Sequence, residues 1–177
     1  YSDLAKALSR TQKGKNYKSF AEARQNVSDM VGGRLEYNED KKEWQFRDKS
    51  RRVYDIAATS EGVKKLSILD LLLGNHYLDN QSIILIDEVE ANLHPSLISR
   101  LLDTILSLAN AGVQFFIASH SYFVIKRLYI MAHQKAMSIP VLSFEDGACQ
   151  VGDLQREMPK NPIVDESINL YMDEISL

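Results

Sequence analysis

The sequence predicts a mixed α/β fold in which helices flank a partly parallel, layered sheet and small antiparallel strands are added. Two apolar runs, residues 83–86 and 113–118, have the composition of buried strands. Between them, apolar residues recur with the spacing of a helix, and the connections are short. A strand, a helix and a second strand joined in this way form the repeating unit of layered α/β proteins. The 177 residues, 45% of them apolar, suffice for one domain of ordinary size.

The first 58 residues are predicted to form helices followed by short strands. Residues 1–31 carry two apolar faces with helical spacing, and the glycine pair at 32–33 ends this helical region. Three short strands joined by charged turns follow, with predicted ranges 34–37, 44–46 and 52–56. The two helical faces consist of Leu4, Ala7 and Leu8, and of Phe20, Ala23, Val27 and Met30.

The middle of the chain is predicted to hold the core of the layered fold. Residues 62–73 are strongly apolar and form a helix buried on most sides. Residues 83–86 form a strand buried on both faces, because the run is continuous and mostly β-branched. Pro95 begins the next helix, since proline is favoured in a first turn. The buried strand 113–118 then leads into a helix that ends near residue 131.

A hairpin and a tail complete the predicted elements. Residues 141–144 and 148–151 flank a Glu-Asp-Gly turn and form the hairpin. The tail contains prolines and is expected to be irregular before a short helix from Asp165. We therefore divide the chain into three segments, 1–58, 59–152 and 153–177.

The composition limits the class of protein and its location. The one cysteine excludes an intramolecular disulfide, and no paired cysteines could bind zinc. No apolar run approaches the roughly 20 residues of a membrane span, and the first residues lack a signal peptide and an initiator methionine. We expect a cytoplasmic protein without a membrane partner, represented by a trimmed or partial chain.

Charge is distributed unevenly along the chain. Residues 1–65 hold 15 Lys and Arg against 10 Asp and Glu, a balance of +5, whereas residues 66–177 hold 6 against 14, a balance of −8. A basic segment attracts phosphate, whether of a nucleotide or of a nucleic acid. A lysine-rich segment can equally be an ordinary solvated surface, and the counts leave both interpretations open.

Two acids follow the first predicted buried strand. Asp87 and Glu88 come directly after the apolar run 83–86, at the end of a strand where ligands of open α/β sheets bind. An acid at that position can hold Mg²⁺, and a second can orient an attacking water. The same pattern also fits a strand followed by an acidic helix cap with no chemical role.

A histidine follows the second predicted strand in the same way. If the two strands are parallel neighbours, His120 leaves the sheet at the same edge as Asp87 and Glu88. Its imidazole could then contact a terminal phosphate, although a histidine at such a position is more often a surface or capping residue.

A helix start with anion-binding character precedes both strands. Ser60 is suited to cap the helix that follows, and Gly62 lets a backbone N–H approach a ligand closely. Lys64 and Lys65 add positive charge to this helix N-terminus. An ordinary cap on a core helix would carry the same residues.

These segments resemble a known family. Residues 87–95, which read Asp-Glu-Val-Glu-Ala-Asn-Leu-His-Pro, resemble the Walker B motif and D-loop of ABC-type ATPases, in particular the SMC/RecF-like and overcoming-lysogenization-defect-type AAA ATPases. Residues 117–121 are similar to their switch-histidine (H-loop) segment, and residues 60–62 to their shortened signature motif. The resemblance covers about residues 31–152 and implies the C-terminal lobe of a P-loop NTPase fold, with residues 59–152 as its ATPase lobe.

The resemblance implies a role for each matching residue. Asp87 would organise Mg²⁺ and its waters, Glu88 would polarise the attacking water, and His120 would sense the γ-phosphate of ATP. The signature-like residues would contact the nucleotide held by a second ATPase subunit, and the D-loop would cross that dimer interface. These nucleotide-contacting residues are Ser60, Gly62, Lys64, Ala91 and Asn92.

One departure from the family pattern is large. A P-loop, G-x-x-x-x-G-K-[ST], cradles the phosphates in these ATPases, but here the pair Gly14-Lys15 is followed by Asn16 and has Ser9 in place of the first glycine. The simplest explanation is that the chain is the C-terminal lobe of a longer ATPase and lacks the Walker A half. A smaller departure is an acid, Glu61, inside the signature-like segment, which the nearby lysines would have to offset.

We expect the whole protein to bind and hydrolyse ATP with Mg²⁺ and to use ATP to dimerise its heads, while this chain alone is inactive. DNA, or a nuclease or other effector protein, is the expected further partner, in DNA repair or phage defence. An alternative is a lobe that dimerises or acts as a scaffold without catalysis. A helicase would carry Ser-Ala-Thr where this chain has Ala-Ser-His, and residues 143–147, which faintly resemble the start of a Toprim domain, fit a β-turn better.

Overall fold

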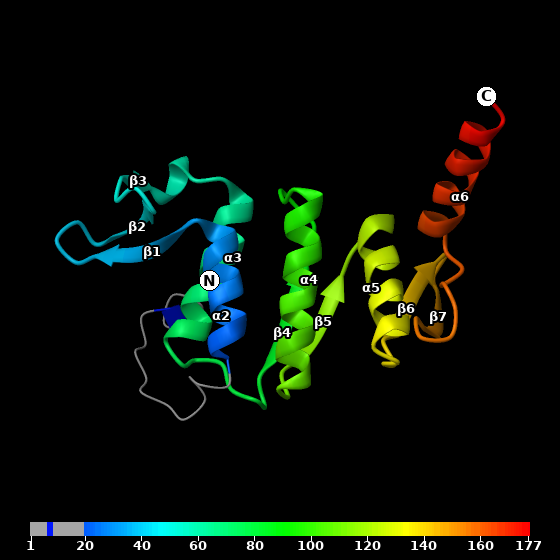
Figure 1. The fold of residues 1–177 in the computed structure, drawn as a ribbon, viewed down its shortest axis with the longest axis horizontal. Helices are drawn as coiled ribbons and strands as arrows, with labels where there is room; N and C mark the ends of the chain where they lie inside the picture. The colour runs from blue at the N-terminus through cyan, green and yellow to red at the C-terminus, as the bar shows by residue number, and fades with distance from the viewer. Residues whose placement is uncertain (1–6, 9–19) are drawn as a thin grey trace. The chain divides into compact units, whose positions relative to one another are not determined.

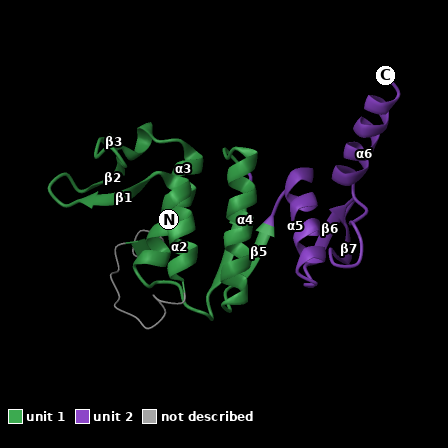
Figure 2. Ribbon diagram, viewed as in Figure 1, with its two compact units in different colours: residues 1–87, 91–117 green, residues 88–90, 118–177 purple. Residues whose placement is uncertain are grey.

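In the computed structural model, the described residues are 7–8 and 20–177, and they form two compact units (Figures 1 and 2). The first unit comprises residues up to 87 together with 91–117, and the second comprises residues 88–90 and 118–177. The predicted face at Leu4 and the Ser9–Asn16 segment compared with a P-loop lie outside the described residues.

Three helices form the core of the first unit. They are α2 (Ala21–Val31), α3 (Glu61–Gly74) and α4 (Pro95–Asn110), and α2 packs against both of the others. Gly32 ends α2 in a left-handed conformation, φ 69°, that is suited to glycine. The predicted apolar faces are confirmed, since the following side chains are buried: Phe20, Ala23, Val27, Met30, Leu66, Leu69, Leu73, Leu101, Leu102, Ile105 and Leu108.

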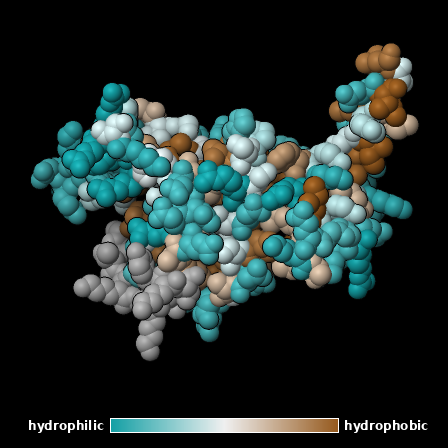
Figure 3. Space-filling model, viewed as in Figure 1, coloured by the Kyte–Doolittle hydropathy of each residue, from teal (hydrophilic) through white to brown (hydrophobic). Residues whose placement is uncertain are grey.

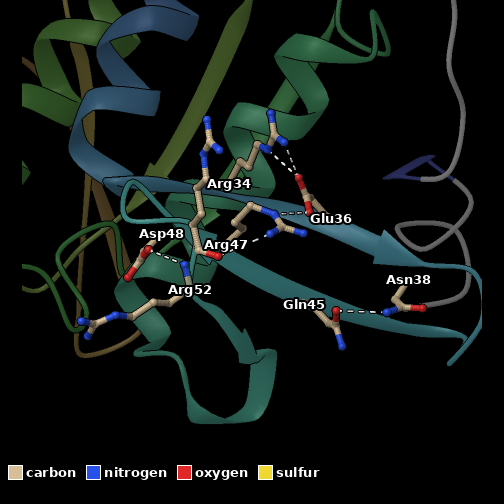
Figure 4. A network of polar contacts seen from close by, with 8 residues as sticks. Arg34, Glu36, Asn38, Gln45, Arg47, Asp48 and Arg52 are labelled. Carbon is tan, nitrogen blue, oxygen red and sulfur yellow. Dashed lines mark hydrogen bonds and ion pairs between the residues drawn. The ribbon is translucent and has the colours of Figure 1, made fainter.

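The three predicted short strands form one antiparallel sheet. They are β1 (Gly33–Asn38), β2 (Glu43–Asp48) and β3 (Val53–Asp55), in the order β1-β2-β3, and a 3₁₀ turn, η2 (Ile56–Ala58), connects them to α3. Charged side chains pair across this sheet (Figure 4). Glu36 accepts from Arg47 Nε at 2.8 Å and forms an ion pair with Arg34 at 2.6 Å.

Strands β4 (Ile83–Asp87) and β5 (Gln114–Ala118) are hydrogen-bonded neighbours, and α4 connects them. The N–H of Gln114, the first residue of β5, donates at 2.9 Å to the carbonyl of Ser82, which directly precedes β4. The two strands therefore begin side by side and run parallel. The predicted strand–helix–strand unit is therefore confirmed.

The predicted burial of these strands on both faces is wrong. Ile83, Leu85 and Phe116 are 58%, 77% and 53% exposed, and they alternate with half-buried residues. A continuous apolar run shows that both faces of a strand are apolar, but it does not show what covers them.

The second unit contains α5 (Tyr122–Gln134), the hairpin of β6 (Pro140–Glu145) and β7 (Ala148–Asp153), and α6 (Pro162–Ile175). The hairpin is confirmed, and Asp146 and Gly147 form its turn with φ of 47° and 78°, as type I′ turns require. The core of this unit consists of Ile125, Ala132, Leu154 and Val164, with Val141 and Tyr129 packed against it.

Helix α6 is longer than predicted. It begins at Pro162, because the side chain of Asn161 accepts from the N–H of Val164 at 3.0 Å and proline fits the first turn. Its later turns expose Ile168, Tyr171, Met172 and other large side chains. Brown, hydrophobic atoms gather at the C-terminal end of the chain in Figure 3. None of the helices in the described part of the chain is long and apolar enough to cross a membrane.

Candidate functional site

The end of β4 carries the predicted acids on an unusual turn. Asp87 is the last residue of the strand and is exposed. Glu88 follows with a φ of 47°, and Asn92 ends the turn with a φ of 60°. Non-glycine residues with positive φ are uncommon, and backbone strain of this kind is concentrated at functional sites. The turn between β4 and α4 therefore places its side chains by a specific backbone shape.

In the second unit, His120 lies beside two carboxylates. Its Nδ1 is 3.8 Å from Glu88 Oε1 and 3.8 Å from Glu90 Oε1. The side chains of His120 and Glu88 are 73% and 54% exposed, so both can reach a ligand, whereas that of Glu90 is only 12% exposed. The predicted proximity of the histidine to the acids is confirmed for Glu88.

Glu90 holds the segment that carries the histidine. The hydroxyl of Ser119 lies 2.9 Å from each of its carboxylate oxygens, and the backbone N–H of His120 donates to Oε1 at 3.2 Å. The N–H of Ser121 in turn donates to the Ser119 hydroxyl at 3.1 Å. The carboxylate thus fixes the backbone between β5 and α5 by a short network of hydrogen bonds.

In the first unit, the start of α3 has the predicted cap. Ser60 precedes the helix, and its hydroxyl accepts from the N–H of Val63 at 3.3 Å. Lys64 Nζ lies 2.6 Å from Glu61 Oε1, so the acid inside this segment is paired with the lysine of the same turn. Lys64 therefore offsets the charge of Glu61, and the pair leaves the helix N-terminus without an unbalanced negative charge.

Gly62 packs against the turn that follows β4. A methyl group added at Gly62 would collide with the carbonyl oxygen of Asn92 and would lie 2.8 Å from Leu93 Cδ2. This position therefore requires glycine because of contacts within the chain, in addition to any ligand. Lys65 also reaches the end of β4, where its Nζ donates to the carbonyl of Asp87 at 3.5 Å. The start of α3, Asp87 and residues 91–92 are thereby brought together in one unit.

One carboxylate of the first unit could hold Mg²⁺ if a nucleotide and waters supplied the other ligands. Asp87 offers one exposed carboxylate at the end of a strand. Mg²⁺ is usually held by one or two carboxylates, with waters and substrate phosphates as its other ligands. Within residues 7–8 and 20–177, no group of three or more His, Cys, Asp or Glu is arranged to hold a metal ion by itself. Phosphate oxygens and waters would supply the remaining ligands at Asp87.

Two contacts of this region do not follow from the sequence. They are the hydrogen bonds of Glu90 with Ser119 and His120, and the link from Lys65 to Asp87. A signal was present for Glu90, because its acid and the serine before His120 both belong to the motifs that predicted the site. The pairing itself could only be found once β4 and β5 were seen as neighbours.

A family described as "AAA domain, putative AbiEii toxin, Type IV TA system" matches residues 3–126, more than half of the chain. The chain belongs to this family. It is therefore an AAA-type ATPase domain, and membership of the family implies nucleotide binding. No curated protein matches the chain significantly.

Solved structures of SMC heads share the fold. The SmcHead bound to the C-winged helix domain of ScpA superposes with a TM-score of 0.53 at 22% identity, covering 77% of this chain and 41% of that one. A structure described under ATP-driven dimerization and DNA stimulated activation of SMC ATPases gives 0.50 at 19% identity, covering 91% and 98%. An Smc head domain from Pyrococcus furiosus gives 0.50 at 20%, covering 90% and 39%. This chain thus spans less than half the length of two of these three relatives.

Proposed function

We propose that the chain supplies the Walker B, switch-histidine, D-loop and signature elements of an ABC-type ATPase site. The observation that supports this most directly is the position of His120, 3.8 Å from Glu88, since each residue follows one of two neighbouring strands in the sequence. An acid and an imidazole this close together can act on one terminal phosphate and on the water that attacks it.

In the proposed reaction, each residue has one task. Asp87 would hold Mg²⁺ through its exposed carboxylate, and the ion would supply positive charge beside the phosphate oxygens. Glu88 accepts a hydrogen bond from the attacking water and orients it in line with the γ-phosphate. His120 donates to a γ-phosphate oxygen through the ring nitrogen that does not face the carboxylates. These are the groups that phosphoryl transfer to water requires for positioning and charge stabilisation.

The start of α3 and the D-loop are proposed to face the nucleotide of a second subunit. Ser60 is exposed, and the free N–H groups of a helix N-terminus favour an anion. The Glu61–Lys64 pair removes the repulsion that an isolated acid would exert on phosphate. Contact between Gly62 and Asn92 couples the two segments, so both would move together at a dimer interface. One relative of the same fold is described by ATP-driven dimerization.

The Walker A half of the site is proposed to lie in another part of the complete protein. The exposed apolar side chains of Ile83, Leu85 and Phe116 support this proposal, since they would be covered when the remaining part of the ATPase packs on β4 and β5.

DNA, or a nuclease or other effector, is proposed as a further partner. Several cations of the basic first third are engaged in ion pairs, among them Arg34 and Arg47 with Glu36 and Lys49 with Asp29, which weakens the case for a nucleic-acid surface on that sheet.

The test is Mg²⁺-dependent ATP turnover by the full-length natural protein, with Glu88→Gln beside the wild type. Loss of the carboxylate should lower kcat by at least about 100-fold, as removal of a general base does. Glu39→Gln, in the exposed turn between β1 and β2, is the matched control and should leave kcat unchanged. Equal turnover in wild type and Glu88→Gln would remove Glu88 from the reaction. A wild type that dimerises with ATP and does not hydrolyse it would establish the scaffold alternative.

A further inference from the structure

We propose that Glu90 is a positioning residue, which orients His120 toward the nucleotide without touching the nucleotide itself. This inference rests on the proposed function, and it assigns a role to an acid that the motif alone left unexplained. It is carried by the hydrogen bonds that Glu90 accepts from two donors, the Ser119 hydroxyl and the His120 N–H, and by the burial of Glu90 beside the exposed Glu88 and His120.

The burial of Glu90 separates its task from that of Glu88. Both acids come from the same turn and both lie 3.8 Å from His120 Nδ1. Glu88 exposes 54% of its side chain, and the corresponding value for Glu90 is 12%. A ligand can therefore reach Glu88, whereas Glu90 is directed into the protein and meets Ser119 and the His120 backbone there.

The hydrogen bonds of Glu90 act on the backbone that carries the histidine. A carboxylate has acceptor sites on both oxygens, and here the Ser119 hydroxyl and the His120 N–H occupy them. Ser119 also accepts from the N–H of Ser121, which directly precedes α5. Ser119 and the N–H of His120 thus bond to Glu90 directly, and the N–H of Ser121 is linked to it through Ser119. Hydrogen bonds to a charged group are stronger than neutral ones, so this corner is rigid.

Glu90 also lies, together with Glu88, on the Nδ1 side of the His120 ring. Glu88 and Glu90 both lie near Nδ1, and an imidazole nitrogen beside carboxylates is favoured as the protonated one. In histidine sites, the partner of one nitrogen commonly decides the tautomer and the direction of the other. Nε2 is then the nitrogen left for a phosphate oxygen. Removal of Glu90 should leave His120 present but free to adopt other rotamers and tautomers.

The kinetic test uses the full-length protein and compares Glu90→Ala, Glu90→Gln and Ser119→Ala with the wild type. Glu90→Ala should lower kcat by about 10- to 100-fold, the range for residues that orient a catalytic or metal-binding histidine. KM for ATP should change less than about threefold, because Glu90 makes no contact with the nucleotide. Glu90→Gln keeps one acceptor and should lose less activity, and Ser119→Ala should lose least, since the His120 N–H keeps its partner. Glu157→Gln, an exposed acid in the same unit, is the control.

A double-mutant cycle separates positioning from a structural role. If Glu90 acts through His120, Glu90→Ala should have almost no further effect on kcat in the His120→Ala background. Equal effects in both backgrounds, or a KM change as large as the kcat change, would overturn the inference. Thermal unfolding of each variant shows whether a loss of activity reflects loss of the fold.

A spectroscopic readout keeps the inference testable apart from turnover. In protein labelled with ¹⁵N at histidine, the His120 ring signals, assigned by their loss in His120→Ala, should report one dominant tautomer in the wild type and a mixture in Glu90→Ala. Unchanged ring signals in a folded Glu90→Ala variant would refute the positioning role. If the wild type hydrolyses no ATP, the proposed function fails, while the ring signals still decide what Glu90 does to His120.

Discussion

Two clusters of charged residues in this chain differ in their balance of positive and negative side chains. In the antiparallel sheet, Glu36 lies between Arg34 and Arg47, so one carboxylate is neutralised by two guanidinium groups. In the second unit the proportions are reversed, because two carboxylates surround one exposed imidazole. The first cluster is satisfied by its own members and contributes to stability. The second has excess negative charge and exposed reactive groups, which suits a site that receives a cation and a phosphate.

The largest expected contrast comes from removing one member of each cluster. His120→Ala should lower ATP turnover of the full-length protein by about 100-fold with little change in melting temperature, since the ring is 73% exposed. Arg47→Ala should leave turnover unchanged and lower the unfolding free energy by about 0.5–1 kcal/mol, as for a partly exposed ion pair. Steady-state kinetics and denaturant unfolding measure both quantities. A stability loss larger in His120→Ala than in Arg47→Ala would contradict the division into functional and structural charges.

A second prediction concerns the backbone on which the site depends. Gly62→Ala should destabilise the protein by about 1–3 kcal/mol, because the new methyl group meets the rigid carbonyl of Asn92. Gly74→Ala, in the last turn of the same helix, should cost less than about 1 kcal/mol, because its methyl group meets the flexible end of Arg24. Urea denaturation of the two variants gives the comparison. Equal effects would show that the Gly62–Asn92 contact does not restrict the site.

A third prediction tests the Glu61–Lys64 ion pair at the start of α3. Lys64→Met leaves Glu61 without its partner and should weaken ATP-dependent dimerisation by about 3- to 10-fold, because an uncompensated acid repels phosphate. The double variant Glu61→Gln with Lys64→Met should recover most of that loss. Sedimentation with ATP, in a background that does not hydrolyse it, measures the dimer. No recovery in the double variant would mean that Lys64 acts on the nucleotide directly.

The smallest expected effect is the pH dependence of the Glu36 cluster. The hydrogen bond from Arg47, with further help from Arg34, holds the pKa of Glu36 below its ordinary value, although burial opposes this. The folded state therefore binds this proton less tightly than the unfolded chain. The resulting stabilisation, about 0.5 kcal/mol, is present above the unfolded pKa and is lost as pH falls through the lower folded one.

The contribution of Asp70 to stability changes with pH in the opposite direction, so it must be measured separately from that of Glu36. Burial raises the pKa of Asp70, with partial compensation from Arg24, so its contribution is present at low pH and lost as pH rises through the folded value. The difference in unfolding free energy between wild type and Glu36→Gln isolates the contribution of Glu36. Parallel curves of unfolding free energy for the two proteins between pH 3 and 6 would show that the cluster contributes nothing.

Local features of the sequence were read correctly because their causes are local. Ser60 caps α3, Pro95 begins α4 and Asp146-Gly147 turns the hairpin, and each depends on bonds within a few residues. Helix α6 begins three residues before the predicted start at Asp165, because Asn161 caps it at Pro162. The prediction that β4 is buried on both faces was wrong, because the burial of a strand depends on the other segments that cover it and not on its own residues.

The candidate site divides in the same way. Its residue types and their order along the chain were visible in the acids after one strand and the histidine after the next, and the parallel pairing of β4 and β5 was the natural consequence. The distinct tasks of Glu88 and Glu90 were not visible, since the two acids are alike in chemistry and stand two residues apart. Only the folded turn, with its positive φ at Glu88, exposes one carboxylate and buries the other against Ser119. Helical periodicity and helix caps depend on residues that are close in the sequence, whereas burial and hydrogen-bond partners depend on segments that meet only after folding.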